Sequence, residues 1–132
     1  MSVDPQLETL LHRSYAAFNR RDMDAAVATM HNDVDWPDMI GNRRVVGREA
    51  VRRYWSAQFD LIDPTVTPTA FAEGAKGQIV VDVHQIVRDK EGNLLSEQDV
   101  QHVYSFKDGL AVAMDVYHDG ALASAPRTST RD

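Results

Sequence analysis

The sequence contains no cysteine. Disulfides, thiolate nucleophiles and cysteine-ligated zinc or iron–sulfur sites are therefore excluded. Long apolar runs are also absent: no stretch approaches the length that spans a bilayer, and the N-terminus carries no apolar signal region. Basic residues are in the minority, with 14 Lys and Arg against 20 Asp and Glu and a net charge of −6. We therefore expect a cytoplasmic protein that binds neither a membrane nor nucleic acid.

Several catalytic motifs are missing as well. The chain has no glycine-rich phosphate loop, no HExxH and no GxSxG pattern. Nucleotide-binding, zinc-protease and serine-hydrolase functions have no support, and no cofactor or metal is expected. What remains is an ordinary composition, with 43% hydrophobic and 26% charged residues in 132 positions. That length and composition predict one globular domain over residues 1–118, followed by a disordered tail over residues 119–132.

The N-terminal half has the periodicity of helices. Asp4 and Pro5 have the residue types of an N-cap and a first helical position, and apolar residues at helical spacing predict a helix over residues 5–19. Asp22 can cap a short second helix reaching to about Met30, and a third helix opens after Gly47. A brief strand is expected over residues 33–36 and a polar loop over residues 42–46.

From residue 66 onward the apolar period changes to two. Strands are predicted over residues 66–73, 78–88, 94–107 and 110–118, with turns at Glu91-Gly92 and Asp108-Gly109. The fold class is therefore α+β: three N-terminal helices pack on the concave face of a curved antiparallel sheet.

Strand register identifies a candidate pocket. With two-residue turns, the last two hairpins place His102 opposite Asp115, with Tyr104 and Tyr117 on the same apolar, helix-covered face. His102 and Asp115 can be a structural pair that satisfies two buried polar groups, or they can belong to a functional cavity.

Three segments carry a family resemblance that covers about residues 5–118: 15–26 (YAAFNRRDMDAA), 47–51 (GREAV) and 102–109 (HVYSFKDG). In these segments the chain resembles the nuclear-transport-factor-2-like superfamily of cone-shaped α+β domains, and within it the SnoaL-like polyketide cyclases and ketosteroid-isomerase-like proteins. The superfamily includes isomerases, cyclases, hydrolases and non-catalytic domains, so these motifs indicate the fold more than the activity.

The resemblance implies catalytic candidates. SnoaL-like cyclases have a His and an Asp from late strands in the pocket, which His102 and Asp115 match, and the Asp exchanges protons with the substrate. Ketosteroid isomerases have a catalytic Asp after the first strand, which falls on Asp38. Their oxyanion tyrosine falls on Ser14, one position before Tyr15. The implied reaction deprotonates a carbon beside a carbonyl, and such enzymes use no cofactor.

Aromatic residues complete the expected site. The candidate substrate-binding residues are Tyr15, Trp36, Tyr54, Trp55, Tyr104 and Tyr117, although aromatics at these spacings also build cores. Two functions follow: a cofactor-independent isomerase or aldol-type cyclase acting on an apolar carbonyl compound, or a non-catalytic ligand-binding or dimerisation domain.

The opposite face of the sheet suggests a homodimer. An apolar strip among charged residues is expected there, and pairing two copies would bury it; its members are Ile86, Val103, Val112, Met114 and Val116. His84, Asp99 and His118 share this face, as a metal site or simply as part of a polar surface.

Overall fold

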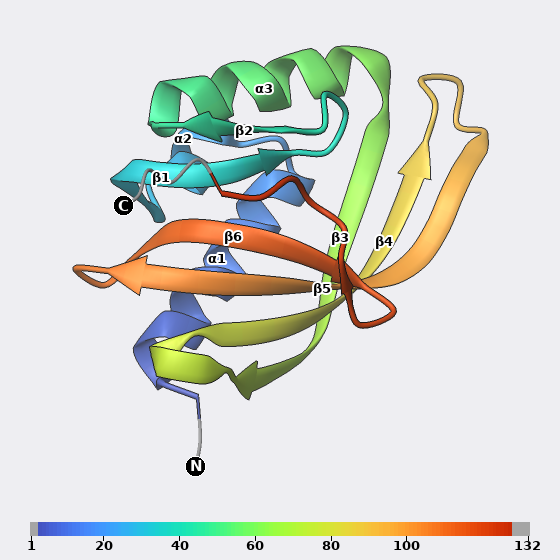
Figure 1. Cartoon of the computed structure of the whole chain (residues 1–132). Coiled ribbons are helices and arrows are strands. Elements are labelled where there is room, and N and C mark those ends of the chain that lie inside the picture. The colour runs from blue at the N-terminus through green and yellow to red at the C-terminus, as the bar shows by residue number, and fades with distance from the viewer. Residues whose placement is uncertain (1–2, 128–132) are drawn as a thin grey trace.

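The computed structural model describes residues 3–127, and Figure 1 shows its helices and strands. The helices are α1 (Pro5–Asn19), α2 (Met23–Val27) and α3 (Arg48–Leu61), with a short 3-10 turn at Ala75–Gly77. The strands are β1 (Met30–Asp38), β2 (Arg43–Val46), β3 (Asp63–Glu73), β4 (Ile79–Arg88), β5 (Leu94–Lys107), β6 (Leu110–His118) and β7 (Ala121–Leu122).

The first two helices begin where their capping residues predict. Asp4 accepts a hydrogen bond from the backbone N–H of Gln6 at 2.9 Å, so the predicted start of α1 is confirmed. Asp22 caps α2 by accepting from the backbone N–H of Ala25 at 3.1 Å. The second helix is shorter than expected, because Met30 already begins β1.

One curved sheet contains all the strands, in the order β2-β1-β6-β5-β4-β3, with β7 paired to β6. The expectation of a purely antiparallel sheet is wrong at one place, because β1 runs parallel to β6. The expected polar loop at 42–46 is also wrong: residues 43–46 form β2, in which Val45 and Val46 pair with Trp36 and Asp35. The polar residues at 43 and 44 gave no strand signal in the sequence. The strand forms because this segment pairs with β1, which directly precedes it in the chain.

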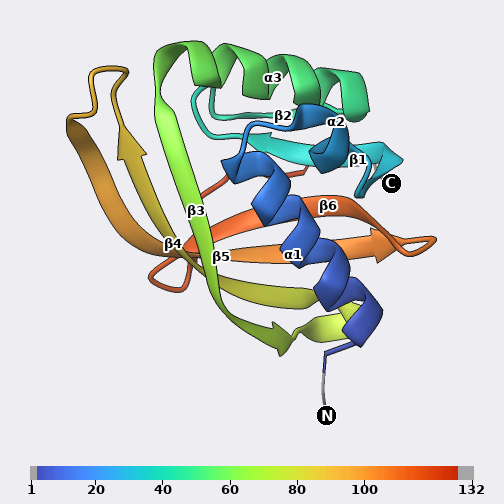
Figure 2. The ribbon, with the colours of Figure 1, turned by 180° about the vertical axis from the view of Figure 1, so that it is seen from behind.

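The helices cover the inside of this curved sheet. In the rear view of Figure 2, α1 crosses the face of the sheet, while α3 lies along β1 and β2 at one end. Buried side chains from the helices and strands form one cluster between these layers, including Leu11, Val51, Trp55, Val81 and Val83. The predicted α+β cone fold, with three helices on a curved and unclosed sheet, is confirmed.

The hairpin registers decide which side chains face the helices. Between β4 and β5, Val81 pairs with His102 and Val83 with Val100, as predicted. The tight turn at Asp108-Gly109 is also confirmed, since both residues have positive φ angles, 55° and 76°.

A β-bulge changes the register beyond that turn. The pairing shifts between Ser105 and Phe106, so His102 lies opposite Val116 and Asp115 lies opposite Val103. The predicted pairing of His102 with Asp115 is therefore wrong. Because side chains alternate between faces, the one-residue shift moves Asp115 to the outer face and brings Met114 and Val116 to the inner one.

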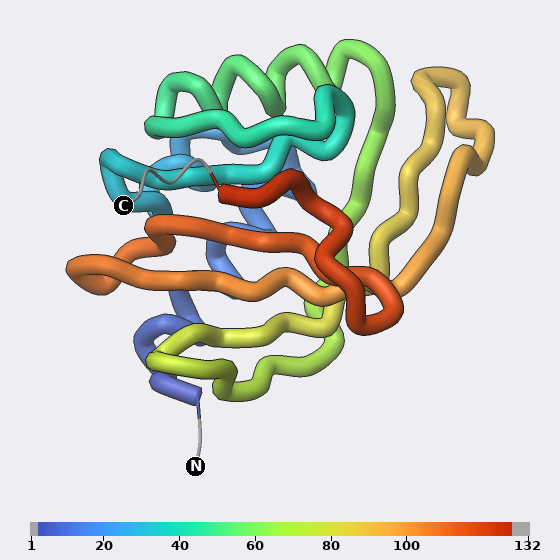
Figure 3. Tube along the Cα trace, in the orientation of Figure 1, coloured from blue at the N-terminus to red at the C-terminus, as the bar shows by residue number. Residues whose placement is uncertain are grey.

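The chain forms one further strand after β6, within the stretch 119–132 that was expected to be a disordered tail. Figure 3 shows the chain turning back along β6 after residue 118. β7 pairs there, and the buried hydroxyl of Ser124 accepts from the backbone N–H of Val116 at 3.0 Å. Residues 128–132 of the predicted tail lie outside the described residues. Among helices of residues 3–127, none has the length and apolar character needed to cross a membrane.

Candidate functional site

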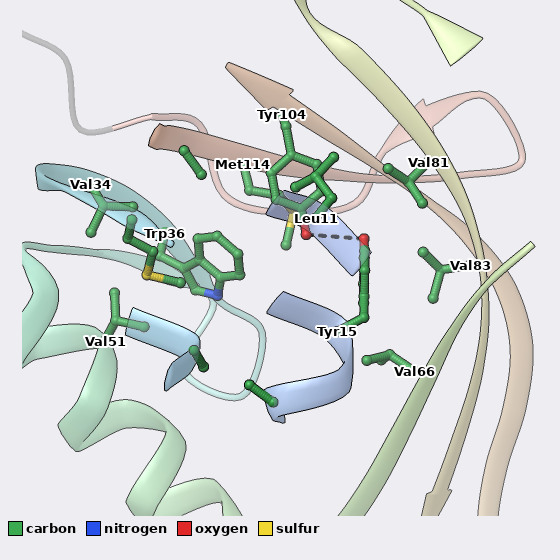
Figure 4. Packing of buried hydrophobic residues seen from close by; sticks show 14 of the residues in the cluster. Leu11, Tyr15, Val34, Trp36, Val51, Val66, Val81, Val83, Tyr104 and Met114 are labelled. Atoms are coloured by element: carbon green, nitrogen blue, oxygen red, sulfur yellow. Dashed lines mark hydrogen bonds between the residues drawn. The ribbon is translucent and has the colours of Figure 1, made fainter. Parts of the chain in front are cut away.

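An apolar pocket opens between the inner face of the sheet and helices α1 and α3. Its cavity volume is about 100 Å³. Most of its walls are aromatic or aliphatic, and the lining residues include Phe18, Trp36, Trp55, Val66, Met114 and Val116. Figure 4 shows the indole of Trp36 within the buried hydrophobic cluster, with the ring of Tyr104 above it. The ring centres of Trp36 and Trp55 are 5.6 Å apart in an edge-on contact.

Three buried polar side chains form a hydrogen-bonded chain in this pocket. The hydroxyl of Tyr104 donates to that of Tyr15 at 3.0 Å, the dashed line in Figure 4. The Tyr15 hydroxyl lies 2.7 Å from Nδ1 of His102. Tyr15 comes from α1 and the other two residues from β5, so helix and sheet both contribute to the chain.

Burial keeps all three groups neutral near neutral pH. Loss of hydration lowers the pKa of His102 from 6.5 to about 4. The same effect raises the pKa of Tyr15 and of Tyr104 well above the usual tyrosine value. Each hydroxyl therefore keeps its proton, and the imidazole carries a single proton.

The position of that proton follows from hydrogen-bond satisfaction. If Tyr104 donates to Tyr15 and Tyr15 donates to Nδ1 of His102, both hydroxyl protons have acceptors. In the reverse order the buried proton of Tyr104 would lack an acceptor, which costs free energy. The first order places the imidazole proton on Nε2. Since Nδ1 is occupied and His102 lines the pocket, Nε2–H is the donor left for a ligand.

A second polar group lies on α3. The Tyr54 hydroxyl oxygen accepts hydrogen bonds from the backbone N–H of Met39 at 3.1 Å and from Nε2 of Gln58 at 3.2 Å. Burial, the largest effect, raises the pKa of Tyr54 to about 12. Oε1 of Gln58 is buried and has no hydrogen-bond partner within residues 3–127. Both side chains line the pocket.

Asp115 lies outside the pocket. Its Oδ1 accepts from Nη1 of Arg44 at 3.1 Å, and its Oδ2 accepts from Nε and Nη2 of Arg127 at 3.0 and 2.8 Å. The bulge in the β5–β6 hairpin turns this carboxylate toward the two arginines and away from His102. The residue predicted as the catalytic base is thus part of an ion-pair network on the outer face.

Asp38 lies outside the pocket too. Its carboxylate is buried but fully engaged: Oδ1 accepts from the backbone N–H groups of Ile40 and Gly41, at 3.0 and 2.7 Å. Oδ2 accepts from Nε of Arg43 at 3.0 Å. A Cβ at Gly41 would lie 2.8 Å from Oδ2, so glycine permits this close turn. With these contacts Asp38 stabilises the turn that connects β1 to β2.

The remaining candidates divide between the two faces. Tyr15, Trp36, Tyr54, Trp55 and Tyr104 line the pocket together with His102, as expected. Tyr117 does not: the register shift places it in a shallow hollow of the outer face, near His84.

The outer-face cluster also differs from the expectation. His84 faces Asp99, and its ring nitrogens lie 2.7 Å from Asp99 and 2.8 Å from Glu97. His118 instead lies near Asp119, because the shifted register pairs Tyr117 with Gln101. In the described part of the chain, no group of three His, Asp or Glu side chains is placed to hold a metal ion.

Several pocket residues were not predicted. Met114 and Val116 were assigned to the outer face, and the bulge that moves them has no signal in the alternating pattern. Gln58 could have been found, because it follows Tyr54 by four positions and such residues share one side of a helix.

Comparison with known proteins identifies the family. The family model of the SnoaL-like domain matches residues 11–114, and the chain therefore belongs to the SnoaL-like family. The resemblance to SnoaL-like proteins noted in the sequence is confirmed, and the likeness to ketosteroid isomerases stays a prediction. A search of curated proteins found no match.

Solved structures share this fold. TerC, co-crystallised with polyporic acid, is 23% identical with a TM-score of 0.75, over 86% of this chain and 92% of that chain. RV0760c from Mycobacterium tuberculosis, in complex with estradiol-17beta-hemisuccinate, is 20% identical with a TM-score of 0.74, over 90% and 95%. The epoxide hydrolase/cyclase-like enzyme SalBIII is 19% identical with a TM-score of 0.70, over 84% and 88%. These likenesses show a fold used by cyclase-type enzymes and by proteins that hold small molecules.

Proposed function

We propose that this protein is a cofactor-independent isomerase or aldol-type cyclase that acts on an apolar carbonyl compound in the cone pocket. The observation that carries the proposal is the chain from Tyr104 through Tyr15 to His102, which leaves the Nε2–H of His102 available in an apolar cavity. His102 then polarises the substrate carbonyl, and neither Asp115 nor Asp38 takes part directly.

The chemistry requires a donor at the oxygen. When the carbon beside a carbonyl loses its proton, negative charge develops on the oxygen, and a fixed donor in a dry site stabilises it. Aligned hydrogen bonds polarise one another, so the two tyrosines strengthen the donor at Nε2. A water molecule at the open side of the pocket takes the proton, which returns at another carbon in an isomerisation. In a cyclisation the enolate carbon instead forms a bond to a second carbonyl carbon, and the alkoxide formed there takes the proton back.

The lining of the pocket restricts the substrate. No carboxylate of the described residues lines it, so the strong base of a ketosteroid isomerase is missing there. The proposal therefore favours substrates whose reacting carbon lies between two carbonyl groups, since such a carbon loses its proton readily. Polyketide-like compounds have this arrangement.

The same observation supports a second candidate function, non-catalytic binding of the same class of compound. The comparisons are compatible with it, because RV0760c and TerC have both been crystallised with small molecules. The two functions differ in whether the bound compound exchanges protons.

One experiment separates them. Trp36 and Trp55 are the two tryptophans of the chain and both line the pocket, so quenching of tryptophan fluorescence reports binding directly. The probes are cyclohexanone and 2-acetylcyclohexanone, and proton NMR in D₂O measures deuterium uptake beside the carbonyl. Exchange faster than in buffer, and lost in His102→Asn, supports the enzyme. Binding without faster exchange supports the non-catalytic function, and absence of binding contradicts both.

Dimerisation through the outer face stays a proposal, but the apolar strip that would form the interface is smaller than predicted. Met114 and Val116 are buried in the pocket, so the predicted apolar strip retains only Ile86, Val103 and Val112. Sedimentation at micromolar concentration tests it, and a single species near 14.8 kDa would contradict it. The cytoplasmic location and the lack of a nucleic-acid partner also remain predictions.

A further inference from the structure

The pocket has a second polar end that the proposed chemistry does not use. It consists of the Tyr54 hydroxyl and the Gln58 amide, both on α3. The Tyr54 oxygen already accepts from Met39 and from Gln58, which leaves its own proton without an acceptor among residues 3–127. Oε1 of Gln58 likewise lacks a donor there. An unmet donor and an unmet acceptor therefore belong to two residues, one helical turn apart on α3, that line the cavity.

Reversing the Gln58 amide does not remove the deficit. In that orientation the Tyr54 hydroxyl donates to Oε1, and the buried NH₂ group of Gln58 is left in need of an acceptor. A hydroxyl group on a ligand completes the hydrogen bonds in both cases. It accepts from Tyr54 and donates to Oε1 in the first orientation, and it accepts from the NH₂ group in the second.

The two polar ends come from different elements, and aromatic rings lie beside each. His102 and Tyr15 belong to β5 and α1, whereas Tyr54 and Gln58 belong to α3. Trp36 bridges the two sides, because its ring centre lies 6.1 Å from that of Tyr104 and 5.6 Å from that of Trp55. Such an arrangement fits a ring compound that carries one oxygen group toward each end.

The size of the cavity limits that compound. Its volume is about 100 Å³. A closed cavity of about 150 Å³ holds a benzene molecule, so this smaller and partly open pocket accommodates no more than one ring. A larger molecule must extend past Met39, which lines the pocket and is 45% exposed.

We propose that the pocket selects small cyclic hydroxyketones, with His102 binding the carbonyl oxygen and the Tyr54–Gln58 pair binding the hydroxyl group. This inference rests on the proposed function for the carbonyl end and adds the residues that determine specificity at the other end. A plain ketone leaves the Tyr54–Gln58 pair unsatisfied, which makes its binding weaker.

The test compares two probes that differ only in the hydroxyl. Dissociation constants of 4-hydroxycyclohexanone and cyclohexanone are measured by tryptophan fluorescence in the wild-type protein, Gln58→Leu and Tyr54→Phe. The wild type should bind the hydroxyketone about fivefold more tightly, as one neutral hydrogen bond predicts. Both variants should lose this preference while still binding cyclohexanone. Gln6→Leu, the same exchange at an exposed position of α1, should retain it.

The possible failures can be told apart. Equal affinity of the wild type for both probes overturns the inference and leaves the carbonyl end intact. A preference that persists in both Gln58→Leu and Tyr54→Phe also overturns it, because another group must then bind the hydroxyl. If neither probe binds, the proposed function fails together with the inference. Circular dichroism of each variant establishes that a lost preference does not reflect unfolding.

Discussion

The hydroxyl of Tyr15 lies 2.7 Å from Nδ1 of His102, although 87 positions separate the two residues. This contact joins α1 to the middle of the sheet inside the core. Without this contact Nδ1 of His102 would be a buried acceptor without a partner, at a cost of about 1 to 3 kcal/mol. Together the two side chains form a satisfied chain whose open end is a ring nitrogen of His102.

Replacing Tyr15 by Phe should destabilise the protein without disturbing its packing. The ring remains, but the Tyr104 hydroxyl and Nδ1 of His102 lose their shared partner. We expect the free energy of unfolding to fall by about 2 kcal/mol, measured by urea denaturation. Tyr117→Phe, on the outer face, should change it by less than about 0.5 kcal/mol. Equal losses in the two variants would contradict the account of the buried chain.

The stability should depend on pH through His102. Its pKa is about 4 in the folded protein and near 6.5 when unfolded. Between these values the unfolded chain binds more protons, so the free energy of unfolding falls as the pH drops from 6.5 to 4. The difference corresponds to about 3 kcal/mol. Urea denaturation across this range should show a smaller fall in His102→Asn, whereas the exposed His12→Asn should match the wild type. A wild-type slope in both variants would exclude His102 as the cause.

The pKa of His84 should be shifted in the opposite direction from that of His102, to above the ordinary histidine value. The charged imidazole donates hydrogen bonds to the carboxylates of Asp99, which has the larger effect, and Glu97, and these bonds raise the pKa of His84 above 6.5. Nitrogen-15 NMR of the imidazole rings should therefore show His84 protonated at a pH where His102 is still neutral. The same spectra at neutral pH report the tautomer of His102, which we expect to carry its proton on Nε2. A proton on Nδ1 would reverse the order of the hydrogen-bonded chain.

Substitutions at Asp115 and at His102 should affect ligand affinity differently. Asp115→Asn weakens the contacts with Arg44 and Arg127, so it should lower stability while the affinity for cyclohexanone stays within about twofold. His102→Asn should weaken that affinity about tenfold, the effect of losing a buried hydrogen bond. If Asp115→Asn abolished proton exchange in a stably folded protein, the catalytic assignment made from the sequence would be restored.

Much of the fold could be predicted because its signals are local. Asp4 and Pro5 determine the start of α1, and the alternating residues of β4 and β5 determine a register that the structure reproduces. The fold class followed from these periods and from the family resemblance. The inner-face positions of His102 and Tyr104 followed from the same alternation.

The candidate site was harder to predict because one bulge decides it. Residues 111–114 are all apolar, so either register of β6 buries apolar side chains, and the alternating pattern cannot choose between them. The deciding contacts of Asp115 come from Arg44, 71 positions away, and from Arg127 in the segment expected to be disordered. Long-range ion pairs of this kind leave no trace in the local sequence.

Arg44 should prove one of the most important side chains for stability. Only 2% of the side chain is exposed, and it donates to the carboxylates of Asp35 and Asp115 and to the backbone carbonyls of Asp35, Met114 and Ala125. Arg44→Met removes all of these donors from a buried site.

We expect this substitution to lower the free energy of unfolding by about 3 to 5 kcal/mol, since it leaves buried charge uncompensated. Arg44→Lys should recover only part of the loss, because a single ammonium group cannot reproduce the fork of the guanidinium. Arg20→Met is the matched control: that side chain is 59% exposed with one contact at 3.4 Å to Asp22, so its loss should cost less than about 1 kcal/mol. Urea denaturation measures the free energy of unfolding of all three variants. A loss below about 1 kcal/mol in Arg44→Met would show that the contacts of Arg44 with Asp35 and Asp115 do not hold β1, β2 and β6 together.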